Sequence, residues 1–199
     1  MNLRPDLEII GKWIKPGSRL LDLGCGDGAL LEYLQGTRDV TGYGLEIDDD
    51  NVTRCIESGV NVIQTDLDAG LQDFSGRSFD YVIMSQTLQA VHYPDRLLEE
   101  ILRIGHEGIV TFPNFAHWKN RIQLAVGGMM PVTRTLPNPW YSTPNIHLCA
   151  VEDFEKLCDE RGVHIIERVM VNDDYRRTSA GNFMPNLLGR TAIYRFRQQ

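Results

Sequence analysis

The stretch from residue 19 to residue 34 constrains the fold most, because it indicates a strand, a glycine turn and a helix in direct succession. The apolar run 19–23 predicts a buried strand, and 29–34 has the composition of a helix. Between them, three of five consecutive residues are glycines, which allow a sharp turn and the close approach of a ligand. The free N–H groups of the helix point to the same place, so we expect a ligand there.

Strands and helices alternate along most of the chain. This alternation favours an α/β fold with a largely parallel sheet covered on both faces, because parallel neighbours need crossover connections. The last two strands are joined only by the loop 172–189, so we expect an antiparallel C-terminal edge. The expected strands are 19–23, 40–47, 60–64, 79–85, 108–112, 164–171 and 190–196, and the expected helices are 3–14, 29–34, 50–58, 95–104 and 152–161.

The segment 113–147 breaks this rhythm. It holds five prolines, a Gly-Gly pair, two methionines and several aromatic residues. Connections of this length are usually functional lids, contact surfaces or disordered segments, and the aromatic residues favour the first two. Because 199 residues suit one core, we expect a single domain over 1–199 with an insertion at 113–147 that acts as a lid or partner surface.

Two acidic residues distinguish between two ligands for the glycine turn. Gly24, Gly26 and Ala29 match a dinucleotide fingerprint, which makes a nicotinamide-dependent oxidoreductase one alternative. Asp22 and Asp27, however, would place negative charge beside a pyrophosphate. An adenosyl sulfonium with an amino group presents cations and hydroxyls instead, so carboxylates favour that ligand.

Two further acids follow the next strands. Glu46 ends the second strand about 20 residues after the turn, the distance at which an acid reaches both ribose hydroxyls. Asp66 follows the third strand, where its side chain and the Leu67 backbone N–H are suited to adenine. The alternatives are a solvated acid at a strand end for Glu46 and a turn aspartate for Asp66.

Four ordered motifs, 20–28, 44–48, 65–67 and 79–83, resemble those of class I S-adenosylmethionine-dependent methyltransferases. The segments 112–118, 140–148 and 153–154 resemble the MetW family of methionine-biosynthesis proteins, and the similarity then covers nearly the whole chain. The resemblance implies a Rossmann-like methyltransferase fold that binds S-adenosylmethionine or S-adenosylhomocysteine. The expected cofactor-binding residues are Asp22, Gly24, Cys25, Gly26, Asp27, Glu46, Ile47, Asp66, Leu67 and Gln86.

The same resemblance implies a role in methionine biosynthesis beside a homoserine O-acyltransferase, as its accessory or activator. A feedback sensor for the adenosyl product of the pathway is one form of that role. The alternative is an active methyltransferase that acts on a small molecule or a protein. The catalytic residues are unknown: His92, His117 and His147 are possible bases, and Asn114 and Tyr141 are possible contacts for a substrate or partner.

Composition excludes several other classes. The net charge of −7 and the absence of a basic stripe argue against nucleic acid. No run of about 18 apolar residues and no signal peptide is visible, so we expect no membrane partner. The four cysteines, Cys25, Cys55, Cys149 and Cys158, lack Cys-x-x-Cys spacing, which favours a reduced cytoplasmic protein without a metal site.

Overall fold

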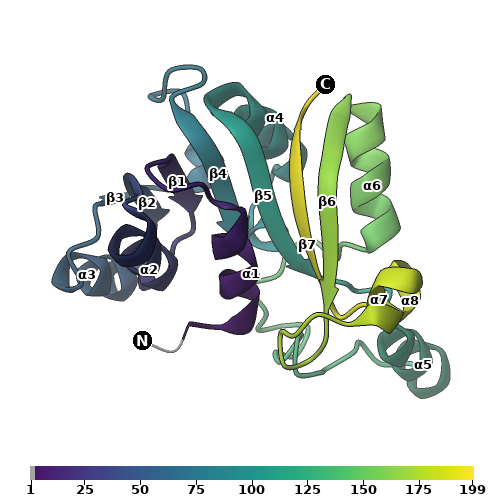
Figure 1. Ribbon diagram of the computed structural model, residues 1–199. Coiled ribbons are helices and arrows are strands. Elements are labelled where there is room, and N and C mark those ends of the chain that lie inside the picture. Colours follow the sequence, from purple (N-terminus) through teal and green to yellow (C-terminus); the bar gives the residue numbers. More distant parts are fainter. Residues whose placement is uncertain (1–2) are drawn as a thin grey trace.

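A computed structural model describes residues 3–199 and shows one seven-stranded sheet with helices on both faces (Figure 1). The strand order is β3-β2-β1-β4-β5-β7-β6. The predicted α/β fold with a mostly parallel sheet is therefore confirmed. The strands are β1 (Arg19–Leu23), β2 (Thr41–Glu46), β3 (Val62–Gln64), β4 (Phe79–Ser85), β5 (Gly105–Pro113), β6 (Val163–Val171) and β7 (Thr191–Gln198).

The two C-terminal strands pair antiparallel, as the sequence predicts. The last strand, β7, also pairs antiparallel with β5, so it lies one strand inside the edge and β6 forms the edge. Burial explains this order. In β7 the residues from Thr191 to Tyr194 are all buried, whereas much of β6 is partly exposed, as suits an edge strand.

The helices divide between the two faces of the sheet. Adjacent strand residues point to opposite faces: Leu20 belongs to the core under α1, α2 and α3, and Leu21 belongs to the core under α4 and α6. Each face is thus closed by apolar helix side chains. These helices are α1 (Pro5–Trp13), α2 (Ala29–Arg38), α3 (Asp49–Glu57), α4 (Pro94–Ile104) and α6 (Val151–Glu160).

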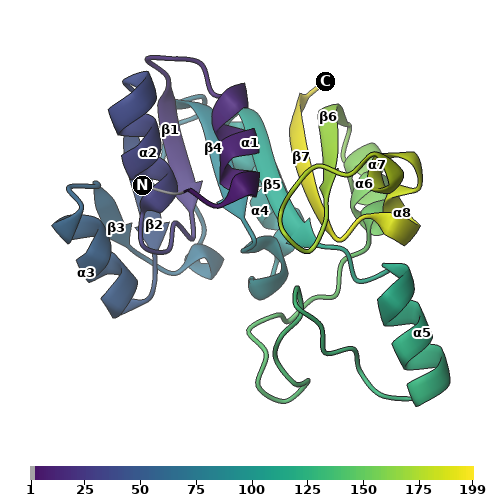
Figure 2. The same ribbon diagram turned by 60° about the horizontal axis from the view of Figure 1, so that its bottom comes forward.

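Three helices lie in segments that the sequence analysis left irregular. Helix α5 (Trp118–Gly127) forms part of the insertion, and α7 (Ser179–Phe183) and α8 (Pro185–Leu188) interrupt the loop before β7. Figure 2 shows α5 and the chain that follows it extending away from the body of the sheet. The N-cap of α5 is His117, whose Nδ1 accepts a hydrogen bond from the Lys119 N–H. A histidine N-cap is an uncommon start signal, so the sequence pattern did not reveal the helix.

Two short 3₁₀ turns, η1 (Leu67–Ala69) and η2 (Leu88–Ala90), follow β3 and β4. Within residues 3–199, no helix combines the length and the apolar character needed to cross a membrane.

Candidate functional site

The glycine turn lies where the strand order changes direction. Strand β1 pairs with β2 on one side and with β4 on the other. Strands β2 and β3 follow on the first side, and β4 and β5 follow on the second. In open α/β sheets, such a switch point leaves a crevice at the carboxyl ends of the strands. The turn is attached to β2 because the N–H groups of Gly24 and Cys25 both donate to the Leu45 carbonyl, at 2.8 and 3.1 Å.

Gly24 and Gly26 both have a left-handed backbone conformation, but their surroundings differ. Gly24 has φ +70°, and a Cβ there would lie 2.6 Å from Thr87 Oγ1. Gly26 has φ +58°, but a Cβ there would meet no protein atom within 4 Å. Gly24 therefore allows close packing against the segment after β4, whereas Gly26 leaves open space beside the turn.

Two cavities meet at Gly24. The larger holds about 590 Å³ and the smaller about 170 Å³. All ten residues that the sequence predicts for the cofactor line one or the other, and their role in binding stays a prediction. The larger cavity is lined by Gly24, Leu45, Glu46, Ile47, Asn51, Thr65, Asp66, Leu67, Asp68, Gln86, Thr87, Ala90, Val91, His92, Pro144 and Asn145. The smaller is lined by Arg4, Leu7, Asp22, Gly24, Cys25, Gly26, Asp27, Ala29, Leu30 and Ser85.

Glu46 joins the end of β2 to the glycine turn. Its Oε2 accepts the Gly26 N–H at 2.8 Å, and its Oε1 accepts the N–H groups of Ile47 and Asp48 at 2.9 and 3.1 Å. A carboxylate offers about four lone-pair positions, so one remains on Oε2 for a ligand hydroxyl. Glu46 is 8% exposed and lines the larger cavity. The residue therefore has a structural role that its position in the sequence did not indicate.

Asp22 is a buried carboxyl group at the end of β1. It is 2% exposed, and its Oδ1 has no hydrogen-bond partner within the described chain. Burial, together with the nearby carboxylate of Glu46, raises the pKa of Asp22 to about 7. An unpartnered buried oxygen is costly. The Asp22 carboxyl, which lines the smaller cavity, is therefore suited to a cationic partner.

The far wall of the larger cavity contains a carboxylate–imidazole pair. His92 Nδ1 lies 2.6 Å from Asp68 Oδ2, and the backbone N–H of His92 donates to Asp68 Oδ1 at 2.8 Å. Asp68 in turn donates its own N–H to Asp66 Oδ1 at 2.9 Å. The hydrogen bonds from His92 lower the pKa of Asp68 despite some burial of its carboxyl. Gln86, on the same cavity, has φ +57°, a strained value that clusters at functional sites.

The thiols near the turn lie where burial favours their protonated form. Cys25 and Cys55 lie with their Sγ atoms 3.8 Å apart, and burial raises the pKa of both. Thiols with raised pKa values stay protonated and are poor nucleophiles and metal ligands. Among residues 3–199, no group of three or more His, Cys, Asp or Glu side chains is arranged to hold a metal ion.

Three other residues considered in the sequence lie away from the cavities. Asn114 donates its Nδ2 to the carbonyls of Pro185, Asn186 and Gly189, which fixes the loop before β7. His117 is 5% exposed, and its burial lowers its pKa to about 4. Tyr141 is 75% exposed in the insertion. The buried pair thus shapes the base of the insertion and lines neither of the two cavities.

Several lining residues were not predicted. Thr87, Ala90 and Val91 after β4, and Pro144 and Asn145 in the insertion, line the larger cavity, and Arg4 and Ser85 line the smaller. The position of 85–92 directly after β4 was a usable signal, because carboxyl ends of neighbouring parallel strands share one edge. Arg4 carried no such signal, since its location depends on how α1 packs.

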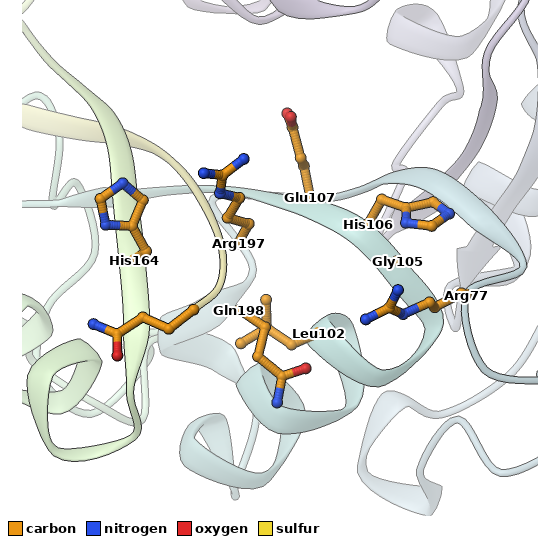
Figure 3. A pocket seen from close by; sticks show the side chains of 9 residues that line it. Arg77, Leu102, Gly105, His106, Glu107, His164, Arg197 and Gln198 are labelled. Atoms are coloured by element: carbon orange, nitrogen blue, oxygen red, sulfur yellow. The ribbon is translucent and has the colours of Figure 1, made fainter.

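A third cavity of about 600 Å³ lies at the opposite end of the sheet, beside the start of β5 and the end of β7. Its lining includes two arginines and two histidines. The lining side chains do not all point to one place: in Figure 3, Glu107 extends away from Arg77 and Gln198. Glu107 is already bound by Arg195 at 2.6 and 3.1 Å. The convergent polar groups therefore lie at the glycine turn, and the candidate site is there.

Comparison with known proteins finds a family that matches nearly the whole chain. The family described as "Methionine biosynthesis protein MetW" matches residues 4–196. The chain is 34% identical over 208 residues to the "Bifunctional methionine biosynthesis protein MetXA/MetW" of Rhodopirellula baltica, covering 100% of this chain and 33% of that protein. It thus spans about a third of the length of this curated relative.

Solved structures share the fold at low identity. An S-adenosylmethionine-dependent methyltransferase from Mesorhizobium loti matches with a TM-score of 0.70 and 16% identity, covering 98% of both chains. Phosphoethanolamine N-methyltransferase 2 of Haemonchus contortus, in complex with S-adenosyl-L-methionine, matches with a TM-score of 0.70 and 14% identity over 98% of this chain and 52% of that one. The fold is that of class I methyltransferases, and the chain belongs to the MetW family of methionine-biosynthesis proteins.

Proposed function

We propose that the chain binds S-adenosylmethionine or S-adenosylhomocysteine across the two cavities and acts as an accessory or activator of a homoserine O-acyltransferase. In this proposal the nucleoside occupies the larger cavity, with the ribose at Glu46 and the adenine between Ile47 and the segment 66–67. The amino-acid end occupies the smaller cavity. The protein is proposed to work in the cytoplasm, and no nucleic acid, membrane or metal ion is part of its function.

The observation that carries the ligand proposal is the orphaned carboxyl of Asp22 beside a glycine turn. Its Oδ1 lacks a partner in the described chain, and the ligand's α-ammonium group would supply one. The open space beside Gly26 leaves room for that group. The uncommitted lone pair of Glu46 adds an acceptor for a ribose hydroxyl. The donor and acceptor set of this site therefore fits an adenosyl amino acid.

The partner proposal rests on the relative from Rhodopirellula baltica, whose name joins MetXA and MetW in one protein. A fusion places two parts at high effective concentration, which favours components that work together. The MetW family is associated with homoserine O-acyltransferases. We therefore take such an enzyme, acting early in methionine biosynthesis, as the partner of this chain.

The insertion 113–147 presents the best surface for that partner, within a single domain that spans residues 1–199. In α5, the one buried residue is the polar Asn120, while Ile122 and Val126 are 53% and 84% exposed. Further along, Trp140 and Tyr141 are 74% and 75% exposed. A helix with its apolar side chains in water and exposed aromatic residues beside it is typical of an interaction surface.

The end of this insertion is also attached to the rim of the larger cavity. The N–H groups of Ile146 and His147 donate to the Gln89 carbonyl at 2.8 and 3.0 Å, and His147 Nε2 lies 3.2 Å from the His92 carbonyl oxygen. Pro144 and its neighbour line the cavity itself. Occupancy of the cavity is therefore expected to affect the partner surface, as a feedback sensor requires.

Adding this chain to a purified homoserine O-acyltransferase is expected to form a complex and to raise the rate of acyl transfer from acyl-coenzyme A to homoserine. Replacing Trp140 and Tyr141 together by alanine should weaken the complex by about thirtyfold or more, because exposed aromatic residues are common binding hot spots. Pull-down and an acyl-transfer assay measure both effects. Ile56→Ala, an exposed apolar change on α3, is the control.

Failure to form a complex, together with an unchanged rate of acyl transfer, would refute the accessory role. Equal weakening by Ile56→Ala would remove the insertion from the interface.

The Asp68–His92 pair favours a second candidate function, methyl transfer to a small molecule or protein. The carboxylate orients the imidazole, and the His92 side chain is 65% exposed at the cavity. An imidazole held in this way can accept a proton from an incoming nucleophile. Labelled methyl transfer from S-adenosylmethionine into cell extract tests this, with His92→Asn expected to abolish it. No incorporation across extracts would argue against catalysis.

A further inference from the structure

The smaller cavity has opposite charges contributed by two distant parts of the chain. The buried carboxyl of Asp22 lies at the end of β1, and the guanidinium of Arg4 lies just before α1. Within residues 3–199, no ion pair or hydrogen bond joins these two groups. Asp27, also on the cavity, uses Oδ1 to accept the Ala29 N–H at 3.2 Å. The cavity thus lies between an unpartnered buried carboxyl group and the guanidinium of Arg4.

The Arg4 guanidinium is oriented by three separate segments. Nε and Nη2 donate to the two carboxyl oxygens of Asp6 at 2.7 and 3.0 Å, and the Asp6 side chain is fully buried. Nη2 also lies 3.4 Å from Ser85 Oγ at the end of β4, and the guanidinium stacks 4.9 Å from the centre of the Tyr175 ring. Within the described chain Nη1 makes no hydrogen bond, and the Arg4 side chain is 39% exposed. The group is therefore held in place with one nitrogen available.

No other arginine or lysine lines either of the two cavities among the described residues. A ligand with an α-amino-acid end carries an ammonium and a carboxylate on the same carbon atom. Asp22 matches the ammonium, whereas a ligand carboxylate beside Asp22 and Asp27 would be repelled unless a cation faced it. A guanidinium N–H forms a short, charge-assisted hydrogen bond to a carboxylate, and the Nη1 of Arg4, which is not used by Asp6 or Ser85, can donate such a bond.

We infer that Arg4 binds the α-carboxylate of the ligand whose α-ammonium group pairs with Asp22, so that the smaller cavity recognises an intact amino-acid zwitterion. This assignment rests on the proposed adenosyl site. It makes Arg4 the residue that distinguishes S-adenosylmethionine and S-adenosylhomocysteine from nucleosides without an amino-acid end, such as 5′-methylthioadenosine. A sensor of methionine metabolism needs this discrimination, since both kinds of compound carry the same adenosine.

Calorimetric titration of the full chain with S-adenosylhomocysteine and with 5′-methylthioadenosine tests the inference. Arg4→Gln is expected to weaken S-adenosylhomocysteine binding about tenfold or more, the usual effect of losing a charged hydrogen bond, and to leave the methylthioadenosine affinity within about twofold. Asp6→Asn should weaken S-adenosylhomocysteine binding less, because it only loosens the orientation of Arg4. Arg19→Gln, an exposed arginine at the opposite end of β1, is the matched control.

The retained affinity for methylthioadenosine shows at the same time that the Arg4→Gln chain is folded. An equal loss for both compounds, or no loss for S-adenosylhomocysteine, would overturn the role of Arg4 and leave the adenosyl site standing. If the unaltered chain bound neither compound, the proposed function would fail, and the assignment of Arg4 with it.

Discussion

Replacing Asp22 by asparagine is expected to stabilise the ligand-free protein at pH 8 and, at the same time, to weaken its binding of S-adenosylhomocysteine. The pKa of Asp22 is raised from 3.8 to about 7 by burial and by Glu46. Between these two values the unfolded chain releases a proton that the folded chain keeps, so the free energy of unfolding falls as pH rises. About three pH units at ~1.4 kcal/mol each make a cost of up to about 4 kcal/mol above pH 7, and asparagine avoids it.

Urea denaturation across the range from pH 3 to pH 8.5 measures this difference. Below pH 4 the carboxyl is protonated in both states, so the advantage of Asp22→Asn should vanish there. A variant that is less stable than the original chain at pH 8 would show that the Asp22 carboxyl is stabilised by a partner rather than strained by burial.

Ligand binding should show the opposite dependence on Asp22. A ligand ammonium pairs with the ionised carboxylate, so below pH 7 the Asp22 carboxyl must release a proton when the ligand binds. The affinity should therefore fall about tenfold for each unit by which the pH is lowered below 7. Asp22→Asn should weaken binding at pH 8 by about thirtyfold or more, because a buried charged pair is lost, and should remove this pH dependence. Calorimetry at several pH values tests both points. An affinity for S-adenosylhomocysteine that is independent of pH in the original chain would place its ammonium group elsewhere.

Replacing Gly26 by alanine is expected to abolish measurable ligand binding with only a modest loss of stability. The new Cβ would meet no protein atom within 4 Å and would occupy space beside the smaller cavity. A left-handed conformation costs alanine about 1–2 kcal/mol, which the fold should tolerate. Calorimetric titration and thermal unfolding measure the two effects.

Gly162→Ala provides a closely matched control. Gly162 has φ +62°, and a Cβ there also meets nothing within 4 Å, but it follows α6 and lines none of the cavities described above. It should lose the same stability and keep full ligand affinity. If Gly26→Ala also bound the ligand normally, the open space at the turn would not be the ligand site.

Local sequence patterns were sufficient to predict much of the fold of this protein. The apolar run before the glycines, the spacing of helical apolar residues and the acids at strand ends are all short-range signals. They predicted the seven strands and the parallel sheet, and the family resemblance added the set of ten residues that the fold brings to two adjoining cavities. The ten residues lie near one another because carboxyl ends of parallel strands converge on one edge wherever the intervening helices lie.

Contacts between distant segments escaped the same reasoning. The place of β7 between β5 and β6 depends on which strand can be buried on both faces. Asn114 and His117 belong to buried contacts at the base of the insertion, although their residue types are equally common in active sites. A side chain's partners are chosen by packing over the whole chain, which periodicity does not describe.

The sequence alone therefore determined the fold class, the glycine turn and the identity of the acids around it, because these follow from local backbone preference and strand direction. Only the tertiary structure decided that Glu46 fastens the turn, that Asp22 is left unpartnered, and that Arg4 reaches the same cavity from before the first helix. Burial and charge at those three groups arise from elements that meet only when the chain is folded.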